Sequence, residues 1–135
     1  MREDEAYMEI AERFILSCDK SIKCSIDVQE VIGFKAYHAF ESLAGAYNSH
    51  HGYHVPTSHV KKINAFVSNS NRDTSVGGYN IAILAMVLSS MRNKYLYPDL
   101  VCGIYKTPKD QLSMTDAKKI VSRVKGIMKN IKKNV

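Results

Sequence analysis

The chain has 135 residues, a length that fits a single domain able to bury a hydrophobic core without disulfides or a structural metal. Hydrophobic residues make up 45% and charged residues 24%, and the three cysteines form no CxxC pair, which excludes a disordered chain, a disulfide framework and a zinc ribbon. Charges interrupt the first apolar stretch, so we expect no signal peptide or membrane span, and the free thiols indicate a cytoplasmic protein.

The net charge of +6 is concentrated at the C-terminal end of the chain. From Lys106 onward, nine Lys and Arg accompany two acidic residues, a local net charge of +7, whereas the first 105 residues sum to −1. Such a segment fits a polyanionic partner, and it fits equally well a solvated lysine face on an amphipathic helix. Its candidate contacts to RNA are Lys118, Arg123 and Lys125.

Helical periodicity dominates the first half of the chain. Apolar side chains in residues 5–22 fall on one face, with charged side chains opposite. Asp27 followed by Glu30 indicates the start of a second helix with an acidic first turn. Its apolar residues recur at steps of three and four, so we expect it to run to about Asn48 and to be the longest helix.

The stretch SHHGYHVPTSH interrupts the periodicity, and Ser58 or Thr57 can cap a short third helix that follows. A polar, glycine-ended loop leads to a fourth helix from about Tyr79, which Pro98 stops.

A connector over residues 105–112 precedes the last helix, which opens at Ser113 or Thr115. No segment alternates with period two for long enough to predict a strand. The sequence therefore predicts an all-α fold, an up-and-down bundle of four long helices with one additional short helix, formed by residues 1–135 as one domain.

Five histidines, four of them in or beside the loop at residues 50–59, raise the question of a metal site. Adjacent His50 and His51 diverge in almost any backbone conformation, and no Asp, Glu or Cys lies nearby in the sequence to complete a closed site. We therefore expect no metal and no cofactor. His38, on the second helix, is expected to be a partly buried, hydrogen-bonded side chain.

The end of the fourth helix, RNKYLYPD, carries the strongest chemical signal. Arg92 can pair with the terminal carbonyls of its own helix, or it can hold a phosphate group with its planar guanidinium. Asn93 adds an amide donor, and Tyr95 and Tyr97 offer ring faces on which an unstacked base could lie. Pro98 biases Tyr97 away from helical dihedral angles, which would let the Tyr97 side chain fold back toward Arg92.

The order of these features resembles the HEPN family of small helical-bundle proteins, many of them RNases, toxins or RNA-binding proteins of prokaryotic defence. GFKAYHAFESLAGAYNSHHGYHVPTSHVKKINAFV resembles the second helix, its break and the histidine before a short apolar helix, here His59. LSSMRNKYLYPD resembles the fourth-helix motif, an arginine and a polar residue followed by a histidine. LSMTDAKKIVSRVKGIMKNI resembles the closing helix.

The resemblance implies a homodimer in which the arginines of two protomers meet in a cleft and hold RNA for metal-independent cleavage. Arg92 and Asn93 match the motif, but Tyr97 stands at the histidine position. An ordinary tyrosine has a pKa of about 10, so almost none of it is ionised at neutral pH and it is a poor general base compared with histidine. Tyr97 is therefore a candidate proton carrier, stacking platform or packing residue.

The interpretation is an RNA-handling protein in which Arg92, Asn93 and Tyr97 are the candidate catalytic residues. Lys94 and Tyr95 are further candidate contacts to RNA, and the resemblance implies a nucleotidyltransferase-type antitoxin as partner. Whether RNA is cleaved or only bound stays open. The alternative is a non-catalytic protein-interaction module in which Arg92 is structural.

Overall fold

The helix α2 is the centre of the fold, because every other helix packs against it. The computed structural model describes residues 1–134. In chain order the elements are α1 (Glu3–Lys23), α2 (Gln29–His50), α3 (His59–Ser70), α4 (Gly78–Leu96), β1 (Asp99–Val101), β2 (Ile104–Lys106), α5 (Pro108–Gln111) and α6 (Met114–Lys133).

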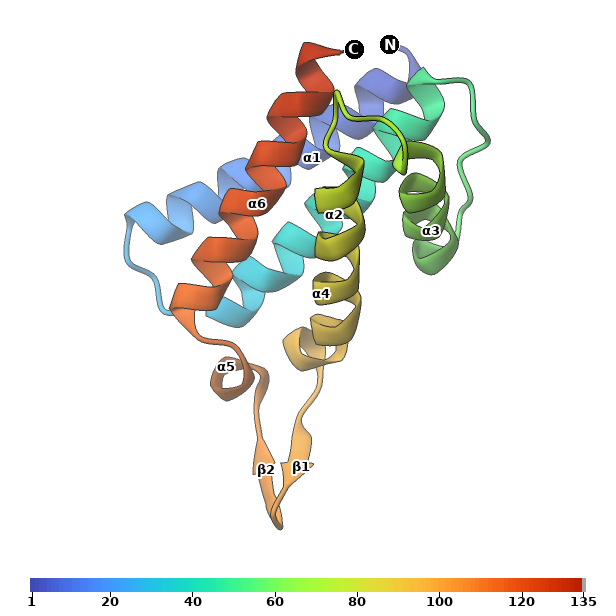
Figure 1. Cartoon of the computed structure of the whole chain (residues 1–135). Helices are drawn as coiled ribbons and strands as arrows, with labels where there is room; N and C mark the ends of the chain where they lie inside the picture. Colours follow the sequence, from blue (N-terminus) through green and yellow to red (C-terminus); the bar gives the residue numbers. More distant parts are fainter. Residues whose placement is uncertain (135) are drawn as a thin grey trace.

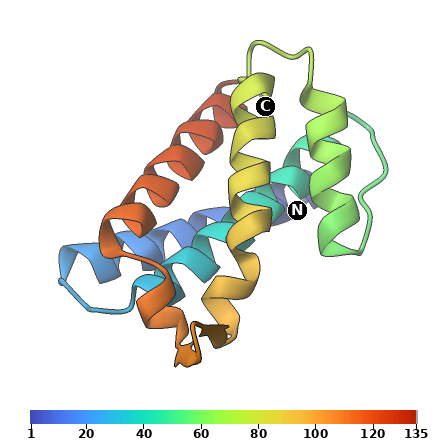
Figure 2. The ribbon, with the colours of Figure 1, turned by 60° about the horizontal axis from the view of Figure 1, so that its bottom comes forward.

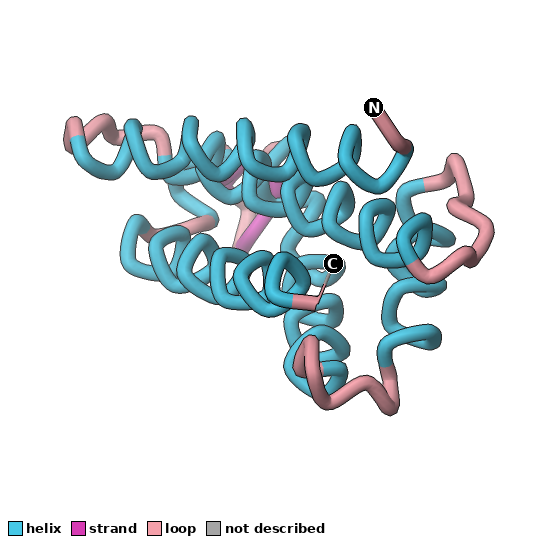
Figure 3. Tube along the Cα trace, turned by 90° about the horizontal axis from the view of Figure 1, so that it is seen from above, coloured by secondary structure: helices cyan, strands magenta, loops and turns pink. Residues whose placement is uncertain are grey.

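The long helices cover α2 from several sides. Helices α1 and α2 run side by side, and α6 packs against both (Figures 1 and 3). Helix α4 lies between α6 and α3, and the two chain termini lie at the same end of the molecule (Figures 1 and 2). The β1–β2 hairpin extends away from the helices at the opposite end (Figure 1).

The second half of α2 is buried on all sides. Every residue from Ala39 to Asn48 is buried, including Glu41 and Asn48, so α2 lacks the exposed polar face of an amphipathic helix. Its small residues let neighbouring helices approach closely. At Gly45, an added Cβ would lie only 2.7 Å from ring atoms of Tyr7 on α1. The prediction that this helix is the longest is confirmed.

The all-α class predicted from the sequence is confirmed at the level of a mostly helical chain with one small sheet. Ser58 caps α3 by accepting from the Lys61 amide, and Ser113 caps α6 by accepting from the Asp116 amide at 3.1 Å. Asp27 does not cap α2, where Val28 holds the N-cap position. No helix in residues 1–134 has the length and apolar character needed to cross a bilayer.

The prediction that the chain contains no strand is wrong. β1 and β2 form an antiparallel hairpin whose turn residues, Cys102 and Gly103, both have positive φ angles of 51° and 77°. Each strand has three exposed residues, too few for alternation to be recognised in the sequence. The Gln111 side chain donates to the carbonyls of Tyr97 and Lys106, which closes the base of the hairpin.

Candidate functional site

Arg92 lies in the last turns of α4, partly exposed and turned toward α2. Its guanidinium carbon is 5.7 Å from the ring centroid of Tyr37, a cation–π distance. Among residues 1–134 no carboxylate lies within salt-bridge distance of Arg92, nor does it hydrogen-bond to the carbonyls of its own helix. The guanidinium therefore has no hydrogen-bond acceptor among the described residues and is partly exposed.

The pKa of Tyr37 depends on burial and on two charged neighbours, Arg92 and Glu41. Burial raises the pKa of the Tyr37 phenol, the Arg92 cation lowers it and the Glu41 anion raises it again. Tyr37 also packs edge-on against His38, with ring centroids 5.5 Å apart. Arg92 thus lies one side chain away from a second group of ionisable residues.

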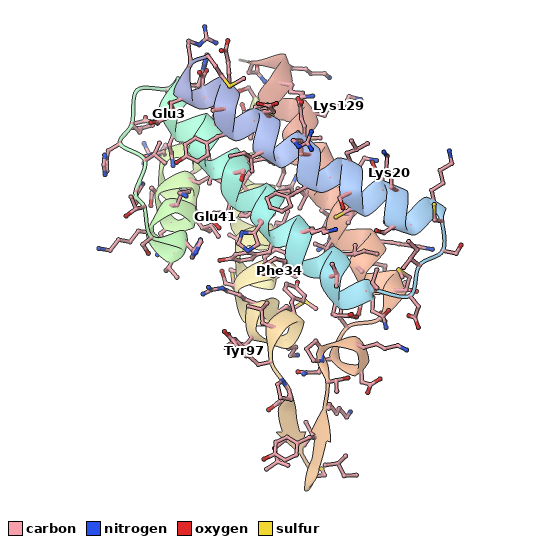
Figure 4. All side chains as sticks on the ribbon, turned by 180° about the vertical axis from the view of Figure 1, so that it is seen from behind. Glu3, Lys20, Phe34, Glu41, Tyr97 and Lys129 are labelled. Carbon is pink, nitrogen blue, oxygen red and sulfur yellow. The ribbon has the colours of Figure 1, made fainter. Side chains whose placement is uncertain are left out.

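Of the residues near Arg92, Asn93, Lys94 and Tyr97 are exposed. Tyr97 has the extended conformation expected before proline, with φ −129° and ψ 146°. The ring that Arg92 contacts belongs to Tyr37 and not to Tyr97. Tyr97 lies at the hairpin end of α4 (Figure 4), so the expected folding back toward Arg92 does not occur.

Tyr95 is not a surface residue, and the prediction that its ring offers a face to a base is wrong. It is 4% exposed and packs against Gly33 and Leu112 in the core. Burial raises the pKa of its phenol, whose oxygen has no hydrogen-bond partner. The sequence already contained an indication that Tyr95 is buried, because it lies on the same face of the helix as the apolar residues Leu84 and Leu88.

The basic residues of α6 face a different side of the molecule. Lys118 and Arg123 are exposed, and Lys125 forms an ion pair with Asp19 of α1 at 3.0 Å. Arg123 lines a groove with Ile83 of α4. Ile83 precedes Arg92 by nine positions, about half a turn around the helix. The structure therefore does not join the α6 candidates and Arg92 into one surface.

Glu41 is the functional candidate that sequence reasoning missed. Its carboxylate, 5% exposed, accepts hydrogen bonds from His59 Nδ1 at 2.7 Å and from Lys62 Nζ at 3.1 Å, both through Oε1. His38 Nδ1 lies 3.5 Å from Oε2, which has no closer donor. We call these four residues, His38, Glu41, His59 and Lys62, the α2–α3 cluster.

The cluster keeps Glu41 ionised. Burial alone raises the pKa of the Glu41 carboxyl, but the donors of His38, His59 and Lys62 outweigh it and lower that pKa to about 2. Its sequence signal was a charged residue inside the apolar, small-residue run AFESLAGAY. A buried charge in such a run requires a partner, although the run does not reveal which one.

The two cluster histidines lie close together. Their ring centroids are 5.8 Å apart and their planes are nearly perpendicular. Rings of Phe14, Phe34 and Tyr37 surround His38, with Phe34 closest at 4.4 Å. The expectation that His38 is partly buried is confirmed, but the expected hydrogen bond is not formed, since its nearest carboxylate oxygen, Glu41 Oε2, is 3.5 Å away and has no hydrogen-bond partner. Figure 4 labels Glu41 and Phe34 on α2, where Glu41 is buried and Phe34 is partly exposed.

The remaining loop histidines are dispersed. His50 Nδ1 lies 3.1 Å from Asp4 of α1, and His51 packs against the Tyr47 ring at 4.3 Å. The sequence argument considered only carboxylates nearby in the chain. In the structure, Asp4 of α1 contacts His50 and Glu41 of α2 contacts His59. In the described part of the chain, no three His, Cys, Asp or Glu side chains are grouped so as to hold a metal ion.

Comparisons with protein-family models, with curated proteins and with solved structures found no match for this chain.

Proposed function

We propose that this protein binds RNA, with Arg92 holding a backbone phosphate next to the α2–α3 cluster. The observation that supports the proposal is the state of Arg92, which is partly exposed, stacked on Tyr37 and without a carboxylate partner in residues 1–134. A guanidinium in this state presents a planar fork of donors that matches phosphate. The alternative, an internal ion pair for Arg92, has no carboxylate partner among residues 1–134.

The charges around Arg92 favour an anionic ligand. Lys94, two positions after Arg92 in α4, is exposed, and Lys62 balances the Glu41 anion. Asn93 is exposed beside Arg92 and adds an amide to the same helix end. Exposed Tyr97 offers a ring for stacking with a base, in a way that the buried Tyr95 does not.

The proposal extends to the HEPN family, whose fourth-helix motif Arg92 and Asn93 resemble. In that case the helices form an up-and-down four-helix bundle with one short helix, and a nucleotidyltransferase-type antitoxin is the expected partner. Supporting this are the order of the helices and the position of Arg92 near the end of α4. A homodimer also belongs to this proposal.

The test is a titration of fluorescently labelled single-stranded RNA in the presence of a chelator. We expect Arg92→Ala to weaken binding about tenfold or more, the effect of losing a charge-assisted hydrogen bond. Arg72→Ala is the matched control, because Arg72 is an exposed arginine in the loop before α4, at the other end of that helix from Arg92. Equal affinities of wild type and Arg92→Ala would refute the proposal.

A second candidate function, protein interaction, is favoured by the exposed face of α4. No charged residue occurs from Gly78 to Met91, although Tyr79 and Met86 are 77% and 74% exposed. Beside this face lies the groove between α4 and α6, of about 450 Å³, with Leu84 and Ile127 among its lining residues. An exposed, uncharged helix face of this kind is typical of an interface.

We propose that this face pairs two copies of the chain. Light scattering coupled to size-exclusion chromatography should then give a dimer for wild type and a monomer for Met86→Glu, which places a charge in the seam. A wild-type monomer at every concentration would refute the pairing.

A further inference from the structure

The α2–α3 cluster contains two imidazole groups held by one carboxylate, and no role has yet been given to them. We propose that His38 and His59 are the acid–base pair that cleaves RNA at the phosphate held by Arg92. This inference rests on the proposed RNA binding and adds a reaction to it. It assigns the proton transfers to histidines of α2 and α3 rather than to Tyr97.

Glu41 positions the reactive nitrogens. Because its carboxylate is ionised, it can only accept hydrogen bonds, so His59 donates from Nδ1 at 2.7 Å. A neutral His59 ring with its proton on Nδ1 has a free acceptor at Nε2, on the side of the ring away from Glu41. An imidazole oriented by a buried carboxylate in this way is a suitable general base or acid.

His38 is farther from the Glu41 carboxylate than His59 is, and aromatic rings pack around it. Its Nδ1 lies 3.5 Å from Glu41 Oε2, a contact that a small movement would turn into a hydrogen bond. Such contacts are commonly long before substrate binds. Oε2 is buried with no other partner, so His38 is the donor available to it.

The two rings are in edge-to-face contact, so the proposal places the phosphate across their outer edges and not between them. With centroids 5.8 Å apart and both Nδ1 atoms directed to one carboxylate, the two Nε2 atoms point away from Glu41 and can reach opposite sides of a phosphodiester. His59 is 49% exposed, which leaves its ring accessible to RNA. Arg92 and His38 both contact Tyr37, at 5.7 Å from guanidinium carbon to ring centroid and 5.5 Å between ring centroids, and in this proposal Arg92 binds the non-bridging phosphate oxygens.

The reaction needs no metal and no second reactant. One histidine, neutral, takes the proton of the ribose 2′-hydroxyl as the 2′-oxygen forms its bond to phosphorus. The bond from phosphorus to the 5′-oxygen breaks, and the other histidine, protonated, gives its proton to that oxygen. The products are a 2′,3′-cyclic phosphate and a 5′-hydroxyl, and exchange with water restores the two histidines. The guanidinium of Arg92 stabilises the charge on the phosphate oxygens in the transition state.

All the groups in this scheme come from one chain, so cleavage does not require a cleft between two protomers. This distinguishes the inference from the dimer cleft that the HEPN resemblance implies. A purely structural role for the histidines is the competing interpretation, because Glu41 is buried and needs donors. The experiment must therefore measure something other than stability.

The experiment compares the full-length wild type with His38→Gln, His59→Gln and His54→Gln on end-labelled single-stranded RNA in chelator. Glutamine keeps an amide donor for Glu41 but moves no proton, and His54 is an exposed loop histidine outside the cluster, which makes it the matched control. We expect either cluster variant to cleave at least about a hundredfold more slowly while binding RNA as wild type does. His54→Gln should cleave at the wild-type rate.

Three further measurements identify the chemistry. Wild-type protein should leave a 2′,3′-cyclic phosphate, and a single 2′-deoxy nucleotide at a cleavage site should abolish cleavage there. The wild-type rate should be bell-shaped in pH, and each cluster variant should lose one limb of the bell. The other ionisable groups facing the pair are Tyr37, Glu41, Lys62, Arg92 and Tyr7.

Each outcome decides between the two proposals. Wild-type protein that binds RNA and leaves it intact overturns the histidine pair but preserves the proposed RNA binding. Absence of RNA binding overturns both. Cleavage that survives both glutamine substitutions places the chemistry elsewhere and overturns the inference, whatever the melting temperatures of the variants.

Discussion

The buried Glu41 carboxylate gives the sharpest prediction about stability. Its pKa in the folded protein is about 2, against an ordinary value of 4.5. Because the folded-state pKa is lowered, the carboxylate stabilises the fold above the unfolded-state value, and this contribution is lost as the pH falls. The full difference corresponds to about 3 kcal/mol of unfolding free energy, of which about 2 kcal/mol is lost between about pH 5 and about pH 3.

The perturbation is Glu41→Gln, which removes the titrating group and leaves Lys62 buried with a neutral partner. We expect the variant to be less stable than wild type by about 3 kcal/mol at about pH 5 and by only about 1 kcal/mol at about pH 3. Denaturant titration followed by circular dichroism measures both values.

Glu12→Gln is the control. Glu12 forms an exposed ion pair with Lys132, so its loss should cost less than about 1 kcal/mol. The reasoning is refuted if the stability difference between wild type and Glu41→Gln is the same at both pH values. That result would mean that the cluster does not hold the Glu41 carboxylate in its ionised form.

Three further predictions concern packing and the thiols. Gly126→Ala should stabilise the protein by about 0.5–1 kcal/mol, because nothing lies within 4 Å of the added Cβ. Gly45→Ala should destabilise the protein by about 1–3 kcal/mol, because the added Cβ would collide with the ring of Tyr7 on α1. Thermal melts of the two variants test both values. Tyr95→Phe removes a buried hydroxyl that has no partner, so chemical denaturation should show unchanged or higher stability, and a loss above about 1 kcal/mol would contradict this. Burial raises the pKa of the Cys18 thiol to about 11, so a thiol reagent at mildly alkaline pH should modify only Cys24 and Cys102 until the protein is unfolded. Rapid modification of all three cysteines in the native protein would contradict the buried position of Cys18.

Local patterns were sufficient to predict five of the six helices and two of their caps, but the connector expected over residues 105–112 contains the short helix α5. The three- and four-residue spacing of apolar side chains depends on helix geometry alone, so it marks α1, α3 and α6 without knowledge of their neighbours. Ser58 and Ser113 cap their helices with side chains that reach only three residues along the chain. The same periodicity assigns Tyr95 to the core, although its neighbours Arg92 and Tyr97 made a surface role attractive.

The candidate site depended on which helix faces meet. Glu41 and His59 are 18 residues apart, and Asp4 and His50 are 46 apart, so neither pair leaves a local signal. Ile83 and Arg92 lie half a turn apart on α4, and only the tertiary structure shows that Ile83 faces α6 whereas Arg92 faces α2.

The sequence by itself determined the positions of α1, α2, α3, α4 and α6 to within a few residues, and that Arg92 lies near the end of the fourth helix. Only the tertiary structure decided that Arg92 rests on Tyr37 beside two histidines and a buried carboxylate, and that the basic face of α6 lies apart from it. The reason is that helix formation follows from hydrogen bonds and side-chain spacing within a few residues. The crossing of helices depends instead on the packing of their whole surfaces.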